Sequence, residues 1–184
     1  MKKIALIVSC IALMSISASA QIKAGHINTS EIISLMSERD SAMVKLQAYQ
    51  ADLIETMQGM QDEFNTKYAE FQKKANDWAP VVLEAKQKEL QELDTRFQQF
   101  QQSAQQDFQQ MQNTLMAPVV EKARVAIEKV AKANGLTYVF DLSAGALIYF
   151  DDASSLDMLP LVKKELGVPA DKVAPTQIGT EQEQ

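Results

Sequence analysis

The side chains that most often carry out chemistry in proteins are scarce in this chain. Among its 184 residues there is one cysteine, Cys10, and one histidine, His26. Zinc sites and activated nucleophiles need several partner groups at suitable spacing, and neither residue has such partners. We interpret His26 as a structural strand residue. We predict no catalytic residue, no metal ligand and no cofactor, so the chain is not expected to be an enzyme.

Three acidic residues lie close together near the C-terminal end: Asp151, Asp152 and Asp157. They resemble a fragment of a calcium-binding loop, but the glycine and the terminal glutamate of such a loop are absent. Helix capping is the better interpretation, because aspartate oxygens accept hydrogen bonds from the free N–H groups at a helix N-terminus.

Residues 1–20 have the pattern of a cleaved signal peptide. Two lysines are followed by an apolar run to about Ile16 and by small residues that end at Ala20, which is the order found in export signals. Cleavage after Ala20 would remove Cys10 and leave no thiol for a disulfide. A lipoprotein site at Cys10 is the less favoured alternative, because the apolar run continues beyond the cysteine.

The mature chain is expected to be acidic. The full chain has a formal net charge of −6 and a pI of about 4.9, and removal of the two signal-peptide lysines with no acidic residue takes the charge from −6 to −8. Proteins that bind nucleic acid or anionic membranes need an excess of lysine and arginine. We therefore expect no nucleic-acid partner.

The middle of the chain, residues 29–134, has the apolar spacing of two long helices. The first run begins after Asn28, a good N-cap, and continues to Asp77, with a joint expected near "SERDS". A turn is predicted near 76–80, where a proline disfavours helical geometry in the residue before it. The second run then continues to Ala133.

A narrow seam of apolar residues follows both runs, mostly at steps of three and four. A seam this narrow cannot be buried in a compact globule, so each helix needs a partner, and we predict an antiparallel coiled-coil hairpin. Counting outward from Ala79 places the small Ala104 near Leu53 and Met57, and a register shifted by one helical turn is the alternative. A client-binding stripe of soft Met and Phe side chains is the alternative, but the periodicity favours a core. The seam residues are Met57, Phe64, Phe71, Phe97, Phe100, Ala104, Phe108, Met111 and Leu115.

The segment from Arg96 to Leu115 holds nine glutamines, a composition that by itself would favour a disordered tract. Every apolar residue after Arg96 in this segment nevertheless lies on the seam. Because glutamine is a good helix former, we interpret these glutamines as the outward face of a helix.

The two ends of the chain have the pattern of a small body that contains β-strands. Residues 21–28 are expected to hold the first strand. Within 135–167, "LTYVFDLS" and "ALIYFDD" are expected to form a β-hairpin through Ala144–Gly145, followed by a short helix over Ser154–Gly167. Residues 168–184 are interpreted as a flexible tail.

This body is too small to be stable as one copy, because three short strands and a short helix bury little apolar surface. We therefore expect the chain to self-associate, so that partner subunits cover its apolar strand residues. The candidates for the oligomer interface are Ile27, Val139, Phe140, Leu147, Ile148, Tyr149 and Phe150.

Three segments, "GHINTSEII", "APVVLEAKQKELQEL" and the closing stretch from "LMAPVVEKARV" to "LVKKELG", give the chain a resemblance to the Skp/OmpH family of periplasmic chaperones. The resemblance implies an α+β fold, mostly α, in which a helical hairpin projects from a body completed by trimerisation. It also implies an ATP-independent periplasmic holdase that keeps unfolded outer-membrane proteins soluble in a cavity between the arms of a homotrimer.

The acidic charge departs from the basic members of that family and argues against direct binding of lipid or lipopolysaccharide. The candidates for client binding lie at the hairpin turn: Trp78, Val81, Val82, Lys73 and Lys74. Trp78 as a cap of the tip and the lysines as a solvated helix face are the ordinary alternatives. A structural or adaptor coiled-coil protein of the cell envelope is the alternative function.

Overall fold

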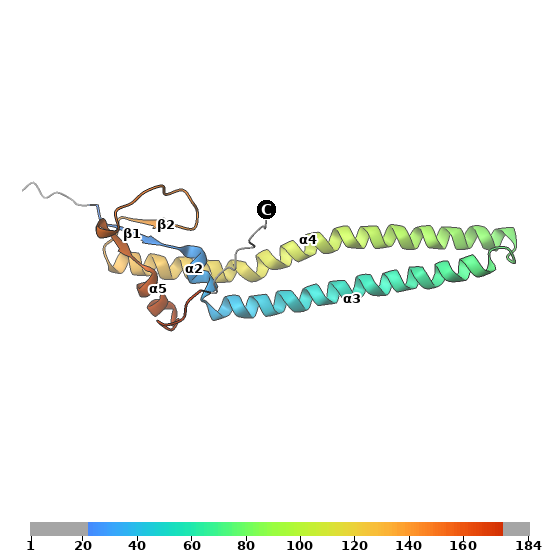
Figure 1. Cartoon of the computed structure of the whole chain (residues 1–184), viewed down its shortest axis with the longest axis horizontal. Coiled ribbons are helices and arrows are strands. Elements are labelled where there is room, and N and C mark those ends of the chain that lie inside the picture. The colour runs from blue at the N-terminus through green and yellow to red at the C-terminus, as the bar shows by residue number, and fades with distance from the viewer. Residues whose placement is uncertain (1–21, 175–184) are drawn as a thin grey trace, which may run out of the picture.

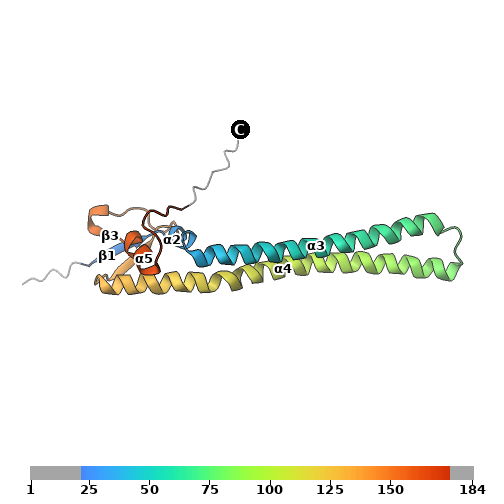
Figure 2. The same ribbon diagram turned by 90° about the horizontal axis from the view of Figure 1, so that it is seen from below.

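The computed structural model describes residues 22–174 of the chain. A small body lies at one end, and two long helices run side by side away from it (Figures 1 and 2). The predicted α+β, mostly helical fold with a long hairpin is confirmed. The predicted signal peptide and the part of the predicted tail from residue 175 onward lie outside the described residues.

The chain enters the body through strand β1, Ala24–Ile27, and helix α2, Thr29–Ser34. The strand ends where Asn28 caps the helix, since its side-chain oxygen accepts a hydrogen bond from the Glu31 N–H at 3.0 Å. After α2, Met36 has an extended backbone and lies between two helices. This break lies directly before the "SERDS" segment, where the sequence predicts a joint.

The arm consists of α3, Ser37–Lys74, and α4, Pro80–Ala133. Ala79 has an extended backbone, with ψ of 149°, because a following proline disfavours helical geometry, while proline itself suits the first turn of a helix. Helix α4 continues through Pro118. Pro118 is exposed, so water can solvate the carbonyl that its missing N–H leaves unpaired.

Helix α4 has Asn134 as its C-cap, and the following Gly135 has φ of 64°, a left-handed conformation that glycine adopts without strain. Strand β2, Tyr138–Asp141, follows, then a short 3₁₀ helix, Asp152–Ser154, strand β3, Ser155–Asp157, and helix α5, Leu159–Leu166. The strands form a parallel sheet in the order β2-β1-β3. The register pairs Ala24 with both Tyr138 and Ser155.

The predicted β-hairpin is wrong. Strands β2 and β3 each pair with β1 in parallel and do not pair with each other. The apolar segment 146–150 belongs to no strand; Figure 1 shows it within a wide loop beside β2. A run of β-forming residues indicates a capacity for strand pairing but does not identify the partner strand. In the structure, β1 is the central strand of the sheet and pairs on both sides.

The predicted last helix begins later than expected, at Leu159 rather than Ser154. Residues 155–157 pair with β1 instead, and the Asp157 side chain accepts a hydrogen bond from the Leu159 N–H at 2.9 Å. Asp151 accepts one from the Ala153 N–H at 3.2 Å. Asp151 is therefore the N-cap of the 3₁₀ helix, and Asp157 accepts from the first turn of α5 although the N-cap position itself is Met158. Asp152 lies within the 3₁₀ helix.

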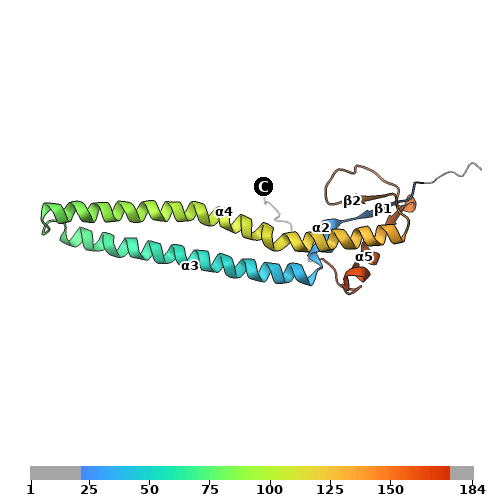
Figure 3. The ribbon, with the colours of Figure 1, turned by 180° about the vertical axis from the view of Figure 1, so that it is seen from behind.

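The body is built on the C-terminal part of α4, against which the sheet and α5 both pack (Figures 2 and 3). One buried cluster joins β1, α2, α4 and α5 and consists of Ile27, Ile32, Ala126, Val130, Met158 and Val162. A second buried cluster, Met36, Ala42, Val119 and Ala123, holds the base of the arm. The segment after α5 is held to that helix by Lys163, whose ammonium donates to the carbonyl oxygens of Ala170 and Lys172, both at 2.7 Å.

Candidate functional site

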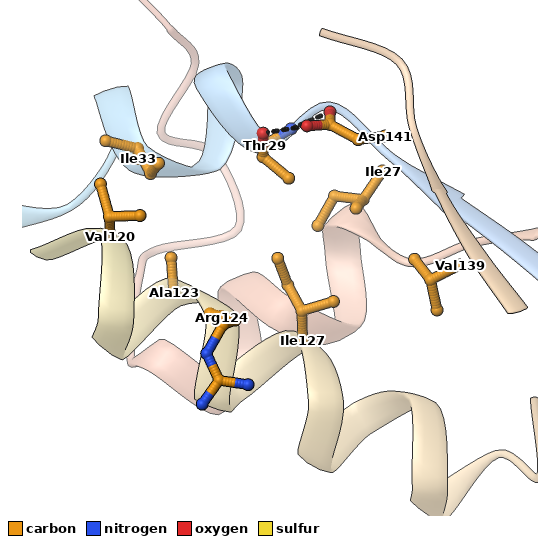
Figure 4. Close-up of a pocket in the computed structure, with 9 residues that line it drawn as sticks. All are labelled: Ile27, Thr29, Ile33, Val120, Ala123, Arg124, Ile127, Val139 and Asp141. Carbon is orange, nitrogen blue, oxygen red and sulfur yellow. Dashed lines mark hydrogen bonds between the residues drawn. The ribbon is translucent and has the colours of Figure 1, made fainter. Parts of the chain in front are cut away.

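An apolar pocket of about 290 Å³ opens between the sheet, α2 and α4 (Figure 4). Its apolar walls come from elements that are far apart in the chain. Parallel pairing of β1 with β2 brings these two strands to the same face of α4. The lining residues are Ile27, Thr29, Ile33, Val120, Ala123, Arg124, Ile127, Val139 and Asp141.

The polar groups at one edge of this pocket form a clamp between the start of α2 and the end of β2. The Thr29 N–H and hydroxyl donate to the Asp141 carboxylate at 3.1 and 2.6 Å, and the Ser143 N–H and hydroxyl donate to it at 2.9 and 2.8 Å. Burial alone would raise the pKa of Asp141, but these hydrogen bonds hold the pKa below its ordinary value. The carboxylate is thus fully engaged in structure.

The one cation of the pocket lining, Arg124, is also engaged. Its guanidinium pairs with Glu121 at 2.7 Å and Glu128 at 3.1 Å. The hydrogen bond with Glu121 raises the pKa of Arg124 further above its high ordinary value. Because these charges compensate one another, the pocket offers an apolar surface rather than a site for an anion.

The other face of the sheet carries aromatic side chains. Tyr138 stacks on Phe140 with ring centroids 6.4 Å apart, and His26 lies 4.6 Å from Phe150. His26 Nδ1 is 2.9 Å from the Ser155 hydroxyl. These contacts place the only histidine in the packing of the sheet.

The oligomer candidates lie in three kinds of place. Ile27 is buried and Val139 half-buried at the pocket, while Phe140 is exposed on the aromatic face. Leu147 and Phe150 are half-buried in the loop between β2 and β3. Ile148 is 100% exposed and Tyr149 82% exposed, so no part of the subunit within residues 22–174 covers them.

Ion pairs across the arm define how α3 and α4 align. Lys67 pairs with Glu89, and Arg96 pairs with Glu63 at 2.6 Å. Near the base, Lys122 pairs with Glu38. The hydrogen bond from Lys67 lowers the pKa of Glu89. Exposed ion pairs of this kind contribute only about 0–1 kcal/mol each to stability. They therefore show how α3 and α4 are aligned but add little to the stability of the arm.

The seam lies between the helices. All of its residues are buried or half-buried, and the polar residues between Phe97 and Ala104 are exposed. Ala104 is 6% exposed and lines the same hollow as Leu53 and Met57. The register counted from the turn therefore agrees with the structure.

The client candidates at the tip differ in their accessibility. Trp78 is half-buried and packs edge-on against Phe71, with ring centroids 5.8 Å apart. Val81 is 72% exposed and Val82 40% exposed. Lys74 pairs with Glu70 at 2.9 Å, and Lys73 is exposed. The tip therefore presents two exposed valines close in sequence to the packed Phe71–Trp78 pair.

Sequence reasoning missed the pocket. Thr29 and Asp141 are 112 positions apart, and no spacing rule connects them. The sequence gives only a weak indication for Ile33 and Ile127 as pocket residues, since each lies on the apolar side of a helix that packs in the body. The missing information is the parallel pairing of β1 with β2.

Residues 22–174 contain no group of three His, Cys, Asp or Glu side chains that could hold a metal ion. Within the same range, every helix is too short or too polar to cross a membrane.

Comparison with known proteins supports the resemblance noted from the sequence. A search of curated proteins gives no significant match. The family described as "Outer membrane protein (OmpH-like)" matches residues 23–166, which include the sheet, both arm helices and α5. This match covers most of the chain and confirms the resemblance. The chain belongs to the OmpH-like (Skp) family.

Proposed function

We propose that the mature protein is an ATP-independent holdase of the periplasm, which binds unfolded outer-membrane proteins and prevents their aggregation. Membership of the OmpH-like family suggests a chaperone of outer-membrane proteins, and the family is periplasmic and non-enzymatic. The observation that carries the proposal is this membership, together with the arm that extends well beyond the body (Figure 1). The two helices of the arm pack mainly on each other, and both also contact elements of the body at the end where they join it (Figure 1).

The working form in this proposal is a homotrimer whose arms surround a cavity. Three observations support self-association. Strands β2 and β3 are the edges of the sheet in one subunit. Ile148 and Tyr149 are left exposed by the described part of that subunit, and the body has an apolar pocket. Unpaired strand edges and exposed apolar side chains commonly mark sites of association.

Client contacts are proposed at the tip of the arm, with Val81 and Val82 as apolar contacts. Their exposure supports this role. Lys73 and Lys74 would attract acidic segments of a client over short distances. Trp78 would act mainly by holding the tip together, since it packs on Phe71.

The proposal is tested by diluting a denatured outer-membrane barrel protein into buffer with and without the mature chain. Light scattering follows aggregation, and the mass in solution gives the oligomeric state. We expect a trimer that suppresses scattering. A trimer with no effect on scattering would favour the adaptor alternative, and a monomer with no effect would refute the holdase.

A further inference from the structure

A hollow of about 490 Å³ opens between α3 and α4 part-way along the arm. Its apolar floor consists of Leu53, Ile54, Met57, Ala104 and Phe108. The hollow exists because Ala104 is the smallest residue of the seam, between the large Phe100 and Phe108. Ile54 remains 42% exposed at its edge, so apolar surface is accessible from solvent here.

Glutamines form the rim of this hollow. Gln98 donates to Asp94 at 2.8 Å, but Gln50, Gln101, Gln102 and Gln105 have no side-chain hydrogen bond to any residue of the described chain. Each free amide offers two N–H donors and a carbonyl acceptor. We call this surface, the apolar floor with its four free amides, the glutamine hollow.

No charged residue lines the glutamine hollow. The ion pair Glu63–Arg96 crosses the arm on the distal side of it, and Glu38–Lys122 crosses on the side of the body. Between these two pairs, the described helices have no ion pair from α3 to α4. An occupant therefore meets an apolar floor and neutral amides, and its own charge has little effect.

The spacing of the amides suits an extended chain. Gln101 and Gln105 are four residues apart on α4, which is about 6 Å along the axis at 1.5 Å per residue. Alternate residues of an extended strand are roughly 6.6 Å apart. Amides on this flank can thus meet successive backbone groups on one edge of a strand, while the side chain of one residue of the strand points into the floor.

We propose that the glutamine hollow is a subsite for one extended segment of an unfolded polypeptide, in which apolar and polar residues alternate. One apolar side chain of the segment occupies the floor, and its backbone N–H and C=O groups pair with Gln101, Gln102 and Gln105. This inference rests on the proposed holdase function. It adds the place on the arm and the kind of segment that is recognised there.

The first test uses the full mature protein with a photoreactive benzoylphenylalanine in place of Gln105. The matched control carries the same residue in place of Gln110, an exposed glutamine of α4 that does not line the hollow. With a freshly diluted barrel protein, we expect crosslinking at Gln105 to exceed that at Gln110 several-fold. Crosslinks mainly to a second copy of the chain, or to its own terminal segments, would identify a different occupant and overturn the proposal.

The second test changes the rim and leaves the seam intact. The double variant Gln101→Glu and Gln105→Glu loses amide donors and adds charge, so the Kd for an unfolded barrel protein should rise about threefold to tenfold. The control pair, Gln106→Glu and Gln110→Glu, adds the same charge to exposed positions outside the hollow and should leave the Kd nearly unchanged. Circular dichroism checks that both keep their helicity.

The outcomes separate this inference from the function on which it rests. If the unsubstituted protein does not suppress aggregation, the holdase proposal fails. If it does suppress aggregation but the two pairs of variants weaken binding equally, or the two crosslinking positions react equally, the holdase stands and the glutamine hollow is not a subsite.

Discussion

The Thr29 hydroxyl donates a hydrogen bond of 2.6 Å to the carboxylate of Asp141, a residue 112 positions later in the chain. This contact joins the first turn of α2 to the last residue of β2 and closes one edge of the apolar pocket. Ser143 completes the set of donors to the same carboxylate. These hydrogen bonds thus join the part of the body that precedes the arm in the chain to the part that follows it.

Loss of this clamp is expected to weaken the body. Asp141→Ala removes the acceptor for the Thr29 and Ser143 donors, and we expect it to lower the free energy of unfolding by about 1–2 kcal/mol. Urea denaturation of the mature protein measures the loss. The control Asp107→Ala, an exposed residue of α4, should change stability by less than about 0.5 kcal/mol; equal effects would contradict a structural role for Asp141.

The same carboxylate predicts a dependence on pH. Its pKa is lower in the folded protein than its ordinary value, so its ionised form stabilises the fold. This contribution is fully present above about pH 4, near the unfolded pKa, and is lost as the pH falls through the folded pKa. Denaturation curves of wild type and Asp141→Asn should therefore converge in acid; a constant difference down to pH 2 would contradict the assignment.

Two glycines offer a matched comparison. A Cβ atom on Gly25 would lie 2.6 Å from Leu136 Cδ1 and 3.2 Å from the carbonyl oxygen of Leu156, whereas one on Gly59 would meet nothing within 4 Å. We expect Gly25→Ala to destabilise the body by about 1–3 kcal/mol. In contrast, Gly59→Ala should stabilise α3 by about 0.5–1 kcal/mol. Thermal unfolding of the two variants distinguishes these opposite signs.

The proposed oligomer can be tested at a residue that the described part of the subunit leaves fully exposed. Because Ile148 is 100% exposed, Ile148→Asp should not alter the fold of an isolated chain. We expect it to reduce the mass in solution from that of a trimer towards that of a monomer. Val173→Asp, at a residue 80% exposed beyond α5, is the control; an unchanged mass for both would place the subunit interface elsewhere.

Client binding at the tip makes a separate prediction. The double variant Val81→Ser and Val82→Ser removes two exposed apolar side chains. It should raise the Kd for an unfolded barrel protein severalfold, since each lost contact reduces the apolar area buried on binding. Val44→Ser changes a valine of α3 that is 65% exposed and serves as the control. Equal binding by all three proteins would remove the tip from the client surface.

The helical part of this protein could be predicted from local patterns. The seam of Phe97, Phe100 and Phe108 specifies which side of α4 faces α3, and the proline at residue 80 places the turn. Both features depend on residues close in sequence, for which helical periodicity and backbone sterics are reliable guides. Even the neighbourhood of Ala104 followed, because in a hairpin the distance from the turn determines the partner.

The sheet could not be predicted in the same way. The run of β-forming residues from Ala146 to Phe150 predicted a strand that the described chain does not contain, while Ser155–Asp157 pairs with β1 despite a weaker pattern. Pairing in a parallel sheet depends on which distant segment reaches a free edge, and that depends on how the body packs on α4.

The sequence by itself therefore determined the hairpin, its capped start at Asn28 and its seam, because these arise from interactions within a few turns of helix. Only the tertiary structure decided that β1 is the central strand, that Thr29 meets Asp141, and that an apolar pocket and a glutamine hollow form between elements. Each of these brings together residues far apart in the chain, and their contact depends on the packing of whole elements rather than on local preference.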